Sequence, residues 1–322
     1  MASGKTGLIR FPMMLVFVLM SFCMAGRLSG VQFISIDRLD NANCQAKQRG
    51  RVERILYDSV TDEGFIKKAV YVYLPYHYEE TDDQYNVFYL LHGSKERPEY
   101  YLNPQEVTKF QNLLDDMIEH QVIDPLIVAA PTWYSDAKTQ SALSLSEQVR
   151  IVKEFPGELE QEILPAVEGA YRTYADSTDP GSLADTRDHR AVGGFSLGGV
   201  ATWYVMLQKM NLFRYYMPLS EASWDDGTGG LSGIYDSFLS AGVINRAVAS
   251  QGYSAQDFLL CAVTGTQDAA FQVMSSQMKA LAFYPDTFQF GKNTCFYIVI
   301  GGKHRREDAI KYSFLGLQIV FT

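Results

Sequence analysis

A serine flanked by glycines constrains this chain more than any other feature. Residues 191–199, with the sequence AVGGFSLGG, indicate a short buried strand that turns sharply at Ser196 into a helix beginning near Val200. Such a turn pushes the serine hydroxyl out at the carboxyl edge of a parallel sheet. Gly194 and Gly198 fit this turn, because a Cβ atom at either position would clash with neighbouring backbone. The segment therefore predicts an accessible, nucleophilic serine on a parallel sheet.

Strands and helices alternate along most of the chain. Apolar runs at residues 86–91 and 125–130 are typical of strands buried on both faces, and residues 107–120 have the apolar period of a helix. Further strands are expected at residues 52–57, 68–73, 215–219, 258–264 and 294–300, and further helices at 155–171 (kinked at Pro165), 200–208 and 270–281. This alternation predicts a mostly parallel sheet with helices on both faces, a three-layer α/β sandwich. The turn at Ser196 is typical of the α/β-hydrolase form of this sandwich.

The first 50 residues differ from the rest in composition. Two basic residues precede an uncharged, mostly apolar stretch at residues 11–25, a pattern typical of an export signal and short for a bilayer span. We expect residues 1–26 to be a cleaved signal peptide, with an uncleaved signal anchor as the alternative. Residues 27–50 are polar and lack a clear period, so we expect a loosely ordered leader before one α/β domain at residues 51–322. These features predict a secreted protein.

Charge and cysteine content narrow the possible functions. The 322 residues carry a formal net charge of −9, whereas binding to nucleic acids or anionic membranes requires a basic surface. We therefore expect no nucleic acid and no membrane as a partner of the mature chain. Cys44, Cys261 and Cys295 are too few for a disulfide framework, and the last two are expected to be buried free thiols. The sequence contains neither metal-ligand spacing nor a phosphate-binding loop, so we expect no metal and no cofactor.

A serine hydroxyl is a good nucleophile only when a base removes its proton and an acid holds that base in the right tautomer. In α/β-hydrolases these groups occur in the order serine, acid, histidine, each at the carboxyl end of a strand. His304 is the only histidine after Ser196, and it follows the strand expected at residues 294–300 and two glycines. We therefore predict that His304 is the base.

The choice of acid is less restricted. Asp268 follows the strand expected at residues 258–264 through a short turn, one strand before the histidine. Because this is where the fold places its acid, Asp268 is the predicted acid. Asp225 and Asp226 follow the preceding strand and remain the alternative.

Two backbone N–H groups are expected to stabilise the negative charge that develops on a substrate carbonyl oxygen. One belongs to Leu197, directly after the serine, and the other to Ser94, which follows His92 and Gly93. His92 itself is expected to support this loop through hydrogen bonds, because it precedes the nucleophile in the sequence.

Three aromatic residues are candidates for the walls of a substrate pocket. Trp133, Tyr134 and Trp224 lie on loops expected at the edge of the sheet that carries the serine. A flat aromatic group would pack well against such side chains. A place in the core is the alternative interpretation, because tryptophan is usually largely buried.

Several motifs together resemble a known family. The segment DHRAVGGFSLGGV at residues 188–200, with TWY at 202–204, is similar to that of the feruloyl and acetylxylan esterases of carbohydrate esterase family 1. The likeness spans about residues 50–320 and includes LLHG at 90–93, PTWY at 131–134, ILPAVE at 163–168, MPLS at 217–220 and GTQD at 265–268. The resemblance implies a serine esterase that removes acyl groups from plant cell-wall xylan, with Ser196 as nucleophile, Asp268 as acid and His304 as base.

The resemblance implies that the substrates are feruloylated or acetylated xylan and its oligosaccharides, and we expect release of ferulate or related hydroxycinnamates. An acetylxylan esterase with the same three residues is one alternative, and acyl transfer to a sugar, as in the similar mycolyltransferases, is another. A catalytically silent carbohydrate-binding relative is the alternative outside the enzymes. Two segments depart from the family pattern: SKE at residues 94–96 replaces further glycines, and RRE at 305–307 replaces aromatic residues.

Overall fold

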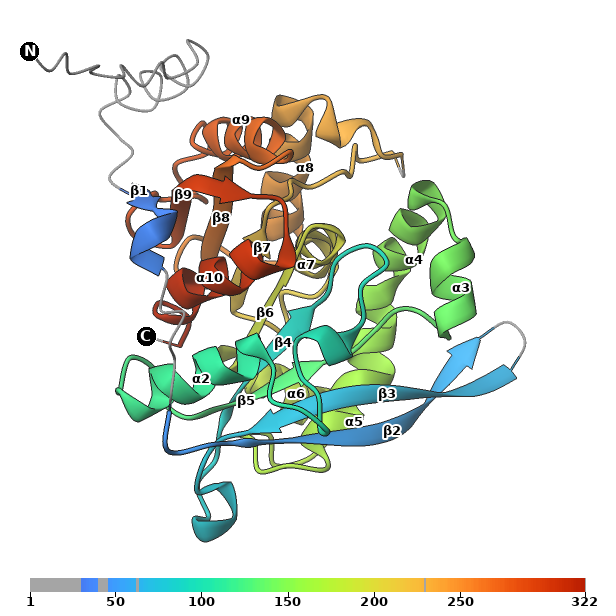
Figure 1. Ribbon diagram of the computed structural model, residues 1–322. Helices are drawn as coiled ribbons and strands as arrows, with labels where there is room; N and C mark the ends of the chain where they lie inside the picture. The colour runs from blue at the N-terminus through green and yellow to red at the C-terminus, as the bar shows by residue number, and fades with distance from the viewer. Residues whose placement is uncertain (1–29, 40–45, 62–63, 229, 322) are drawn as a thin grey trace, which may run out of the picture.

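A nine-stranded sheet forms the centre of the molecule (Figure 1). The computed structural model describes residues 30–39, 46–61, 64–228 and 230–321, so the expected signal peptide and Cys44 lie outside the described residues. The strands are β1 (Val31–Ser35), β2 (Arg51–Thr61), β3 (Gly64–Leu74), β4 (Asn86–Leu91), β5 (Leu126–Ala130), β6 (Arg190–Phe195), β7 (Tyr215–Leu219), β8 (Leu259–Gln267) and β9 (Thr294–Lys303). Their order is β1-β9-β8-β7-β6-β4-β5-β3-β2, and β3 runs in the direction opposite to that of all the others.

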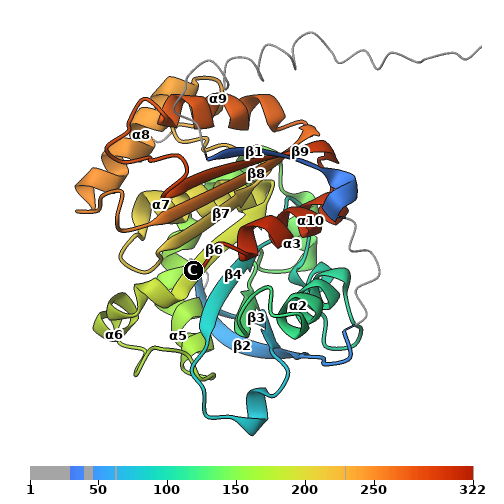
Figure 2. The same ribbon diagram turned by 90° about the vertical axis from the view of Figure 1, so that its left-hand side faces the viewer.

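Different helices cover the two faces of this sheet (Figures 1 and 2). One face packs against α2 (Lys109–Glu119) and α10 (Arg306–Leu317). The opposite face packs against α4 (Leu145–Glu158), α5 (Leu164–Glu168), α6 (Pro180–Asp185), α7 (Leu197–Gln208), α8 (Ser237–Ser250) and α9 (Phe271–Leu281), and a short helix, α3 (Ala137–Ala142), precedes α4. The predicted three-layer α/β sandwich is confirmed.

The central strands are buried because both of their faces are apolar. All residues of β5, β6 and β7 are buried. In β4, Val87, Tyr89 and Leu91 belong to the core on one face of the sheet. Phe88 and Leu90 belong to the core on the other face. A strand that contributes to two cores has no polar face, which is why these segments read as continuous apolar runs.

The expectation of a loosely ordered leader is wrong for the described part of residues 27–50. Val31–Ser35 form β1, which pairs in parallel with β9, and the N–H of Phe296 donates to the carbonyl of Gly30. The side chains of β1 are half-buried or exposed, so the segment carries no apolar period. Backbone hydrogen bonds to the sheet, rather than burial of one face, hold it in place.

Four helices, α3, α6, α8 and α10, were not predicted from the sequence. Eight residues of α10 are buried, and they include the polar Asp308 and Ser313. A helix that buries polar residues on several sides lacks the simple apolar stripe on which prediction depends. The helix expected at residues 155–171 is also different, because it begins at Leu145 and passes through a π-helical segment, Leu159–Ile163, into α5. Pro165 is the second residue of α5 and directly follows the π-helical segment, where the regular hydrogen-bond pattern that a proline interrupts is already broken.

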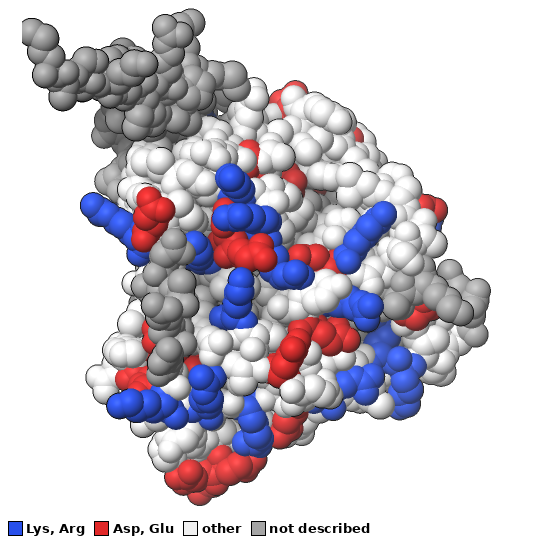
Figure 3. Space-filling model, in the orientation of Figure 1, with Lys and Arg blue, Asp and Glu red and all other residues white. Residues whose placement is uncertain are grey.

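Two remaining features concern the cysteines and the surface. Cys261 and Cys295 are free thiols on neighbouring strands; Cys261 is buried, as expected, and Cys295 is half-buried. Lys and Arg side chains lie interspersed with Asp and Glu on the face shown in Figure 3. Within the described ranges, no helix has both the length and the apolar character needed to cross a bilayer.

Candidate active site

The candidate nucleophile sits on a strained turn at the carboxyl edge of the sheet. Ser196 separates β6 from α7 and has φ 55° and ψ −117°, a combination that side-chain-bearing residues rarely adopt. Its N–H donates to the carbonyl of Leu219 at 2.9 Å, and its own carbonyl accepts the N–H groups of Gly199 and Val200. Hydrogen bonds on both sides therefore hold the serine in a conformation that costs free energy.

Close packing around the turn explains the flanking glycines. A Cβ atom at Gly194 or Gly198 would meet the carbonyl oxygen of Leu91 at far less than contact distance. That oxygen belongs to β4, the strand next to β6, and cannot move without disturbing the sheet. Only glycine allows the start of α7 to lie this close to β4.

Three side chains that follow the carboxyl ends of β6, β8 and β9 form a chain of hydrogen bonds. The hydroxyl of Ser196 lies 2.9 Å from Nε2 of His304, and Nδ1 of His304 lies 2.7 Å from Oδ1 of Asp268. Asp268 and His304 directly follow β8 and β9. In this arrangement the carboxylate fixes the imidazole in the tautomer whose Nε2 accepts the serine proton.

Asp268 is well placed to hold a charge next to the imidazole. Its side chain is 0 % exposed, and Oδ1 also accepts the N–H of Ala270 at 2.8 Å. The second oxygen, Oδ2, is buried without a hydrogen-bond partner among the described residues. The carboxylate is therefore shielded from water and directed at His304.

The surroundings of His304 act on its pKa in opposite directions. Burial by itself lowers the pKa, because a charged imidazolium loses hydration. The hydrogen bond and charge of Asp268, followed by the charges of Glu221 and Glu96, more than offset this effect. The pKa of His304 is therefore raised above its usual value.

The alternative acids are engaged elsewhere. Asp225 Oδ2 lies 3.2 Å from Nζ of Lys153. Asp226 accepts hydrogen bonds from the following loop, namely from Thr228, Gly230 and Ser232. These bonds lower the pKa of Asp226 and stabilise the loop. Neither aspartate contacts His304 in the structure.

A cavity of about 410 Å³ opens in front of the serine. Ser196, Leu197, His304 and Ser94 lie on its wall, and most of the remaining wall is apolar. Its other lining residues are Leu145, Glu221, Trp224, Ile234, Ala269, Ala270 and Val273. The backbone N–H groups of Leu197 and Ser94 donate to no described residue, so both expected oxyanion donors remain available at the cavity.

The three aromatic candidates have different places. Trp224 lines the cavity, so the interpretation as a pocket wall, rather than as a core residue, applies to it. Trp133 and Tyr134 do not line it; they are 3 % and 4 % exposed and pack on the ring of His92, with centroid distances of 4.1 Å and 5.5 Å. The expectation that Trp133 and Tyr134 form pocket walls is therefore wrong, because both rings are buried in the core, where they pack against the imidazole of His92.

His92 supports the loop that follows β4, as expected. Its Nδ1–H donates to the carbonyl of Gly93 at 2.8 Å, and its Nε2 accepts the hydroxyl of Thr132 at 2.8 Å. Burial lowers the pKa of His92 to about 4. A neutral ring can make one donor and one acceptor contact at the same time, which both of these partners require.

The two segments that depart from the family pattern contact each other. Glu96 Oε1 lies 3.5 Å from Nη1 of Arg306, and Glu96 Oε2 accepts the N–H of Gly93 and the hydroxyl of Tyr101. This role of Glu96 in fixing the loop before Ser94 was not predicted. The only signal in the sequence is the opposite charge of Glu96 and Arg306, which lie 210 positions apart.

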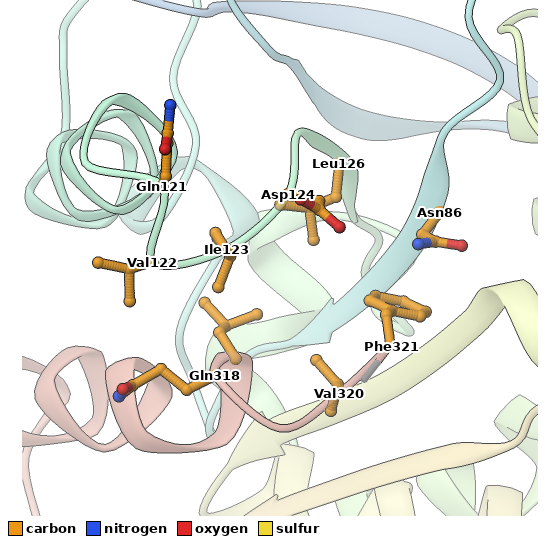
Figure 4. Close-up of a pocket in the computed structure, with 10 residues that line it drawn as sticks. Asn86, Gln121, Val122, Ile123, Asp124, Leu126, Gln318, Val320 and Phe321 are labelled. Atoms are coloured by element: carbon orange, nitrogen blue, oxygen red, sulfur yellow. The ribbon is translucent and has the colours of Figure 1, made fainter.

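A second cavity, of about 140 Å³, lies at the other end of the strands (Figure 4). Asn86 and Leu126, the first residues of β4 and β5, line it together with Val320 and Phe321 near the carboxyl terminus. The serine follows the last residue of β6, so the two cavities lie at opposite edges of the sheet. Among the described residues no cluster of His, Cys, Asp and Glu is suited to a metal ion.

Comparison with known proteins gives consistent matches. The family model described as Esterase, putative esterase, matches residues 66–310. Endo-1,4-beta-xylanase Y of Acetivibrio thermocellus is 33 % identical over 278 residues, which cover 83 % of this chain and 23 % of that protein. The chain thus spans about a quarter of the length of this curated relative.

Solved structures show the same relationship. A serine-to-alanine mutant of the feruloyl esterase module from Clostridium thermocellum, complexed with sinapinate, is 32 % identical with a TM-score of 0.71, covering 85 % of this chain and 89 % of that one. The ferulic acid esterase of Anaeromyces mucronatus in complex with ferulic acid is 19 % identical with a TM-score of 0.64, covering 89 % and 97 %. At 19 % identity, the likeness to the Anaeromyces mucronatus enzyme shows a shared fold and nothing further.

Proposed function

Because this chain belongs to the esterase family, as a carboxylic ester hydrolase of the feruloyl esterase type of carbohydrate esterase family 1, we propose that it releases ferulate and related hydroxycinnamates from plant cell-wall xylan. One observation supports this proposal most strongly. The hydrogen-bonded chain of Ser196, His304 and Asp268 lies on the wall of an apolar cavity large enough for an aromatic acyl group.

The proposed reaction proceeds in two steps through an acyl-enzyme. Ser196 Oγ attacks the ester carbonyl carbon while His304 Nε2 takes the hydroxyl proton, and Asp268 stabilises the resulting imidazolium. The N–H groups of Leu197 and Ser94 stabilise the oxyanion of the tetrahedral intermediate. His304 then gives its proton to the departing sugar oxygen as the bond between that oxygen and the carbonyl carbon breaks. In the second step water attacks the acyl-enzyme by the same route, and Ser196 regains its proton.

The cavity favours a hydroxycinnamoyl group over an acetyl group. Trp224, Leu145, Ile234 and Val273 offer a largely apolar wall for a flat ring. An acetyl group would leave most of the volume of about 410 Å³ without protein contacts. The sinapinate held by the similar feruloyl esterase module supports the same choice. An acetylxylan esterase remains the alternative activity.

The nucleophile is tested by Ser196→Ala. Loss of the serine of such a triad lowers kcat by about 10⁶-fold, so hydrolysis of methyl ferulate should become undetectable. The circular-dichroism spectrum should be unchanged, because replacing the serine hydroxyl by hydrogen at the cavity wall does not alter the packing of the fold. Hydrolysis of methyl ferulate by Ser196→Ala at the wild-type rate would rule the assignment out.

The acyl group and the alternatives are distinguished by a substrate panel. We expect faster release of hydroxycinnamates from their methyl esters, and from feruloylated arabinoxylan, than of acetate from an aryl acetate. The reverse order would indicate an acetylxylan esterase, whereas xylan binding without turnover would indicate a silent carbohydrate-binding protein. Product analysis with an acceptor sugar present would detect acyl transfer.

We also propose that the protein is secreted, on the basis of the apolar stretch at residues 11–25. Expression of the full chain in a bacterial host, followed by amino-terminal sequencing of the protein outside the cell, tests this. We expect a new amino terminus close to residue 27.

A further inference from the structure

A buried glutamine on α4 contacts the loop that carries the second oxyanion donor. Gln148 is 1 % exposed, and its Oε1 accepts the hydroxyls of Ser94 at 2.7 Å and Tyr134 at 2.5 Å. Its Nε2 donates to the carbonyl of Leu143 at 3.2 Å. This last bond fixes the orientation of the amide, so that its oxygen faces both hydroxyls.

The loop itself has a conformation that needs support. Residues 93–96 form a turn in which the N–H of Glu96 donates to the carbonyl of Gly93 at 3.2 Å. Lys95, the third residue of this turn, has φ 57°, a value at which glycine is favoured and a Cβ atom is strained. The N–H of Lys95 donates to the hydroxyl of Tyr134 at 3.1 Å. Tyr134 thus links the strained residue to Gln148.

These contacts determine where the backbone of Ser94 lies. The hydroxyl of Ser94 is bound to Gln148, and Ser94 also lines the cavity with Ser196. Its N–H donates to no described residue. Without Gln148 both hydroxyls would lose a buried acceptor, and neither end of the Ser94–Lys95 segment would be tied to α4.

We propose that Gln148 is a positioning residue for ester hydrolysis, which holds the N–H of Ser94 at the oxyanion through the hydroxyls of Ser94 and Tyr134. The inference rests on the proposed esterase function and extends it to a residue outside the cavity wall. A donor placed to within a fraction of an ångström stabilises the tetrahedral intermediate, whereas the planar ester in the ground state depends on it far less. Loss of Gln148 should therefore lower kcat and leave KM nearly unchanged.

The test is Gln148→Met, which keeps the length of the side chain and removes the acceptor. We expect kcat for methyl ferulate to fall by about 10- to 100-fold, the range for a displaced or lost oxyanion donor, while KM changes by less than about 3-fold. Gln111→Met is the matched control: Gln111 is buried on α2 and donates to the carbonyl of Gly50 at 3.0 Å, so its loss should leave kcat unchanged.

Two further readouts separate positioning from general loss of structure. A boronic acid that forms a tetrahedral adduct with Ser196 should bind Gln148→Met more weakly by the factor lost in kcat, whereas the affinity for ferulate should not change. Ser94→Ala should lower kcat in the wild-type protein and have no further effect in Gln148→Met, because both changes remove the same contact.

Tyr134→Phe, which keeps the ring packed on His92, provides a second variant if Gln148→Met does not fold, and the same loss of kcat is expected.

The outcomes are distinguishable from failure of the proposed function. A wild-type protein without esterase activity would refute that function itself. An active wild-type protein together with a fully active Gln148→Met, or with equal losses of boronate and ferulate affinity, would overturn the positioning role alone. Additive effects of Ser94→Ala and Gln148→Met would overturn it as well.

Discussion

At the scale of single residues, the imidazole of His304 governs how the proposed reaction depends on pH. His304 must be neutral to accept the serine proton, and its pKa is raised because Asp268, Glu221 and Glu96 outweigh the effect of burial. Protonation therefore inactivates the site at a higher pH than it would for an unperturbed histidine. We expect the acid limb of the kcat/KM profile to have its midpoint above pH 6.5, the usual pKa of a histidine side chain.

Asp268→Asn tests this dependence. The variant removes the partner that contributes most to the raised pKa of His304, so the acid limb should move to lower pH. It also removes the acceptor that selects the tautomer of His304, so kcat should fall by about 10⁴-fold. Asp225→Asn is a matched control, because Asp225 pairs with Lys153 rather than with His304, and this variant should retain kcat. A pH profile of Asp268→Asn that coincides with the wild-type profile would contradict the assigned acid.

At the scale of elements, the turn from β6 to α7 depends on space rather than on side-chain contacts. Its two glycines lie against the carbonyl oxygen of Leu91, so an added methyl group has no room to relax. By contrast, a Cβ atom at Gly157 on α4 would meet nothing within 4 Å. The two positions make opposite predictions for the same substitution.

Gly198→Ala and Gly157→Ala form the matched pair. We expect Gly198→Ala to lower the free energy of unfolding by more than about 4 kcal/mol, the range of severe packing defects, or to prevent soluble expression. Gly157→Ala should raise the free energy of unfolding by about 0.5–1 kcal/mol, because alanine favours the helix and restricts the unfolded chain. Urea denaturation measures both changes. Equal effects of the two substitutions would show that the close approach of β4 and α7 does not constrain the turn.

The elements also differ in how readily the sequence predicts them. Strands such as β4 and β7 can be predicted directly from the sequence, because a strand buried on both faces is an unbroken run of apolar residues. The start of α4 was missed, although Ser144 and Glu147 form a capping box there. No comparable signal marks α10, whose buried side chains include polar ones.

At the scale of the whole molecule, the amino-terminal strand protects the edge of the sheet that carries His304. β1 pairs along Phe296 to Ile300 of β9, and His304 follows β9 directly. Removal of β1 would expose the backbone donors and acceptors of β9 along this edge. The strand therefore contributes to the stability of the site, although it lies outside the esterase family match at residues 66–310.

Truncation tests this contribution. A chain that begins at residue 40 lacks β1, and we expect a lower Tm, a lower kcat for methyl ferulate and a tendency to self-associate through the exposed edge of β9. A chain that begins at residue 30 keeps β1 and serves as the control, with the Tm of the processed protein. Differential scanning calorimetry and size-exclusion chromatography give the comparison. Identical Tm values for the two chains would mean that β1 adds nothing to the fold.

The sequence by itself determined the three-layer fold and the three residues of the hydrogen-bonded chain. Local signals were sufficient, since apolar runs mark the strands, and the elbow at Ser196 together with the fixed order of the fold leaves one histidine and a favoured aspartate. The tertiary structure alone decided that Trp224 lines the cavity while Trp133 and Tyr134 pack on His92. It also brought Glu96 to Arg306, and Gln148 to Ser94. Contacts between residues on distant elements leave no periodic or local trace in a sequence, because they depend on how the layers pack.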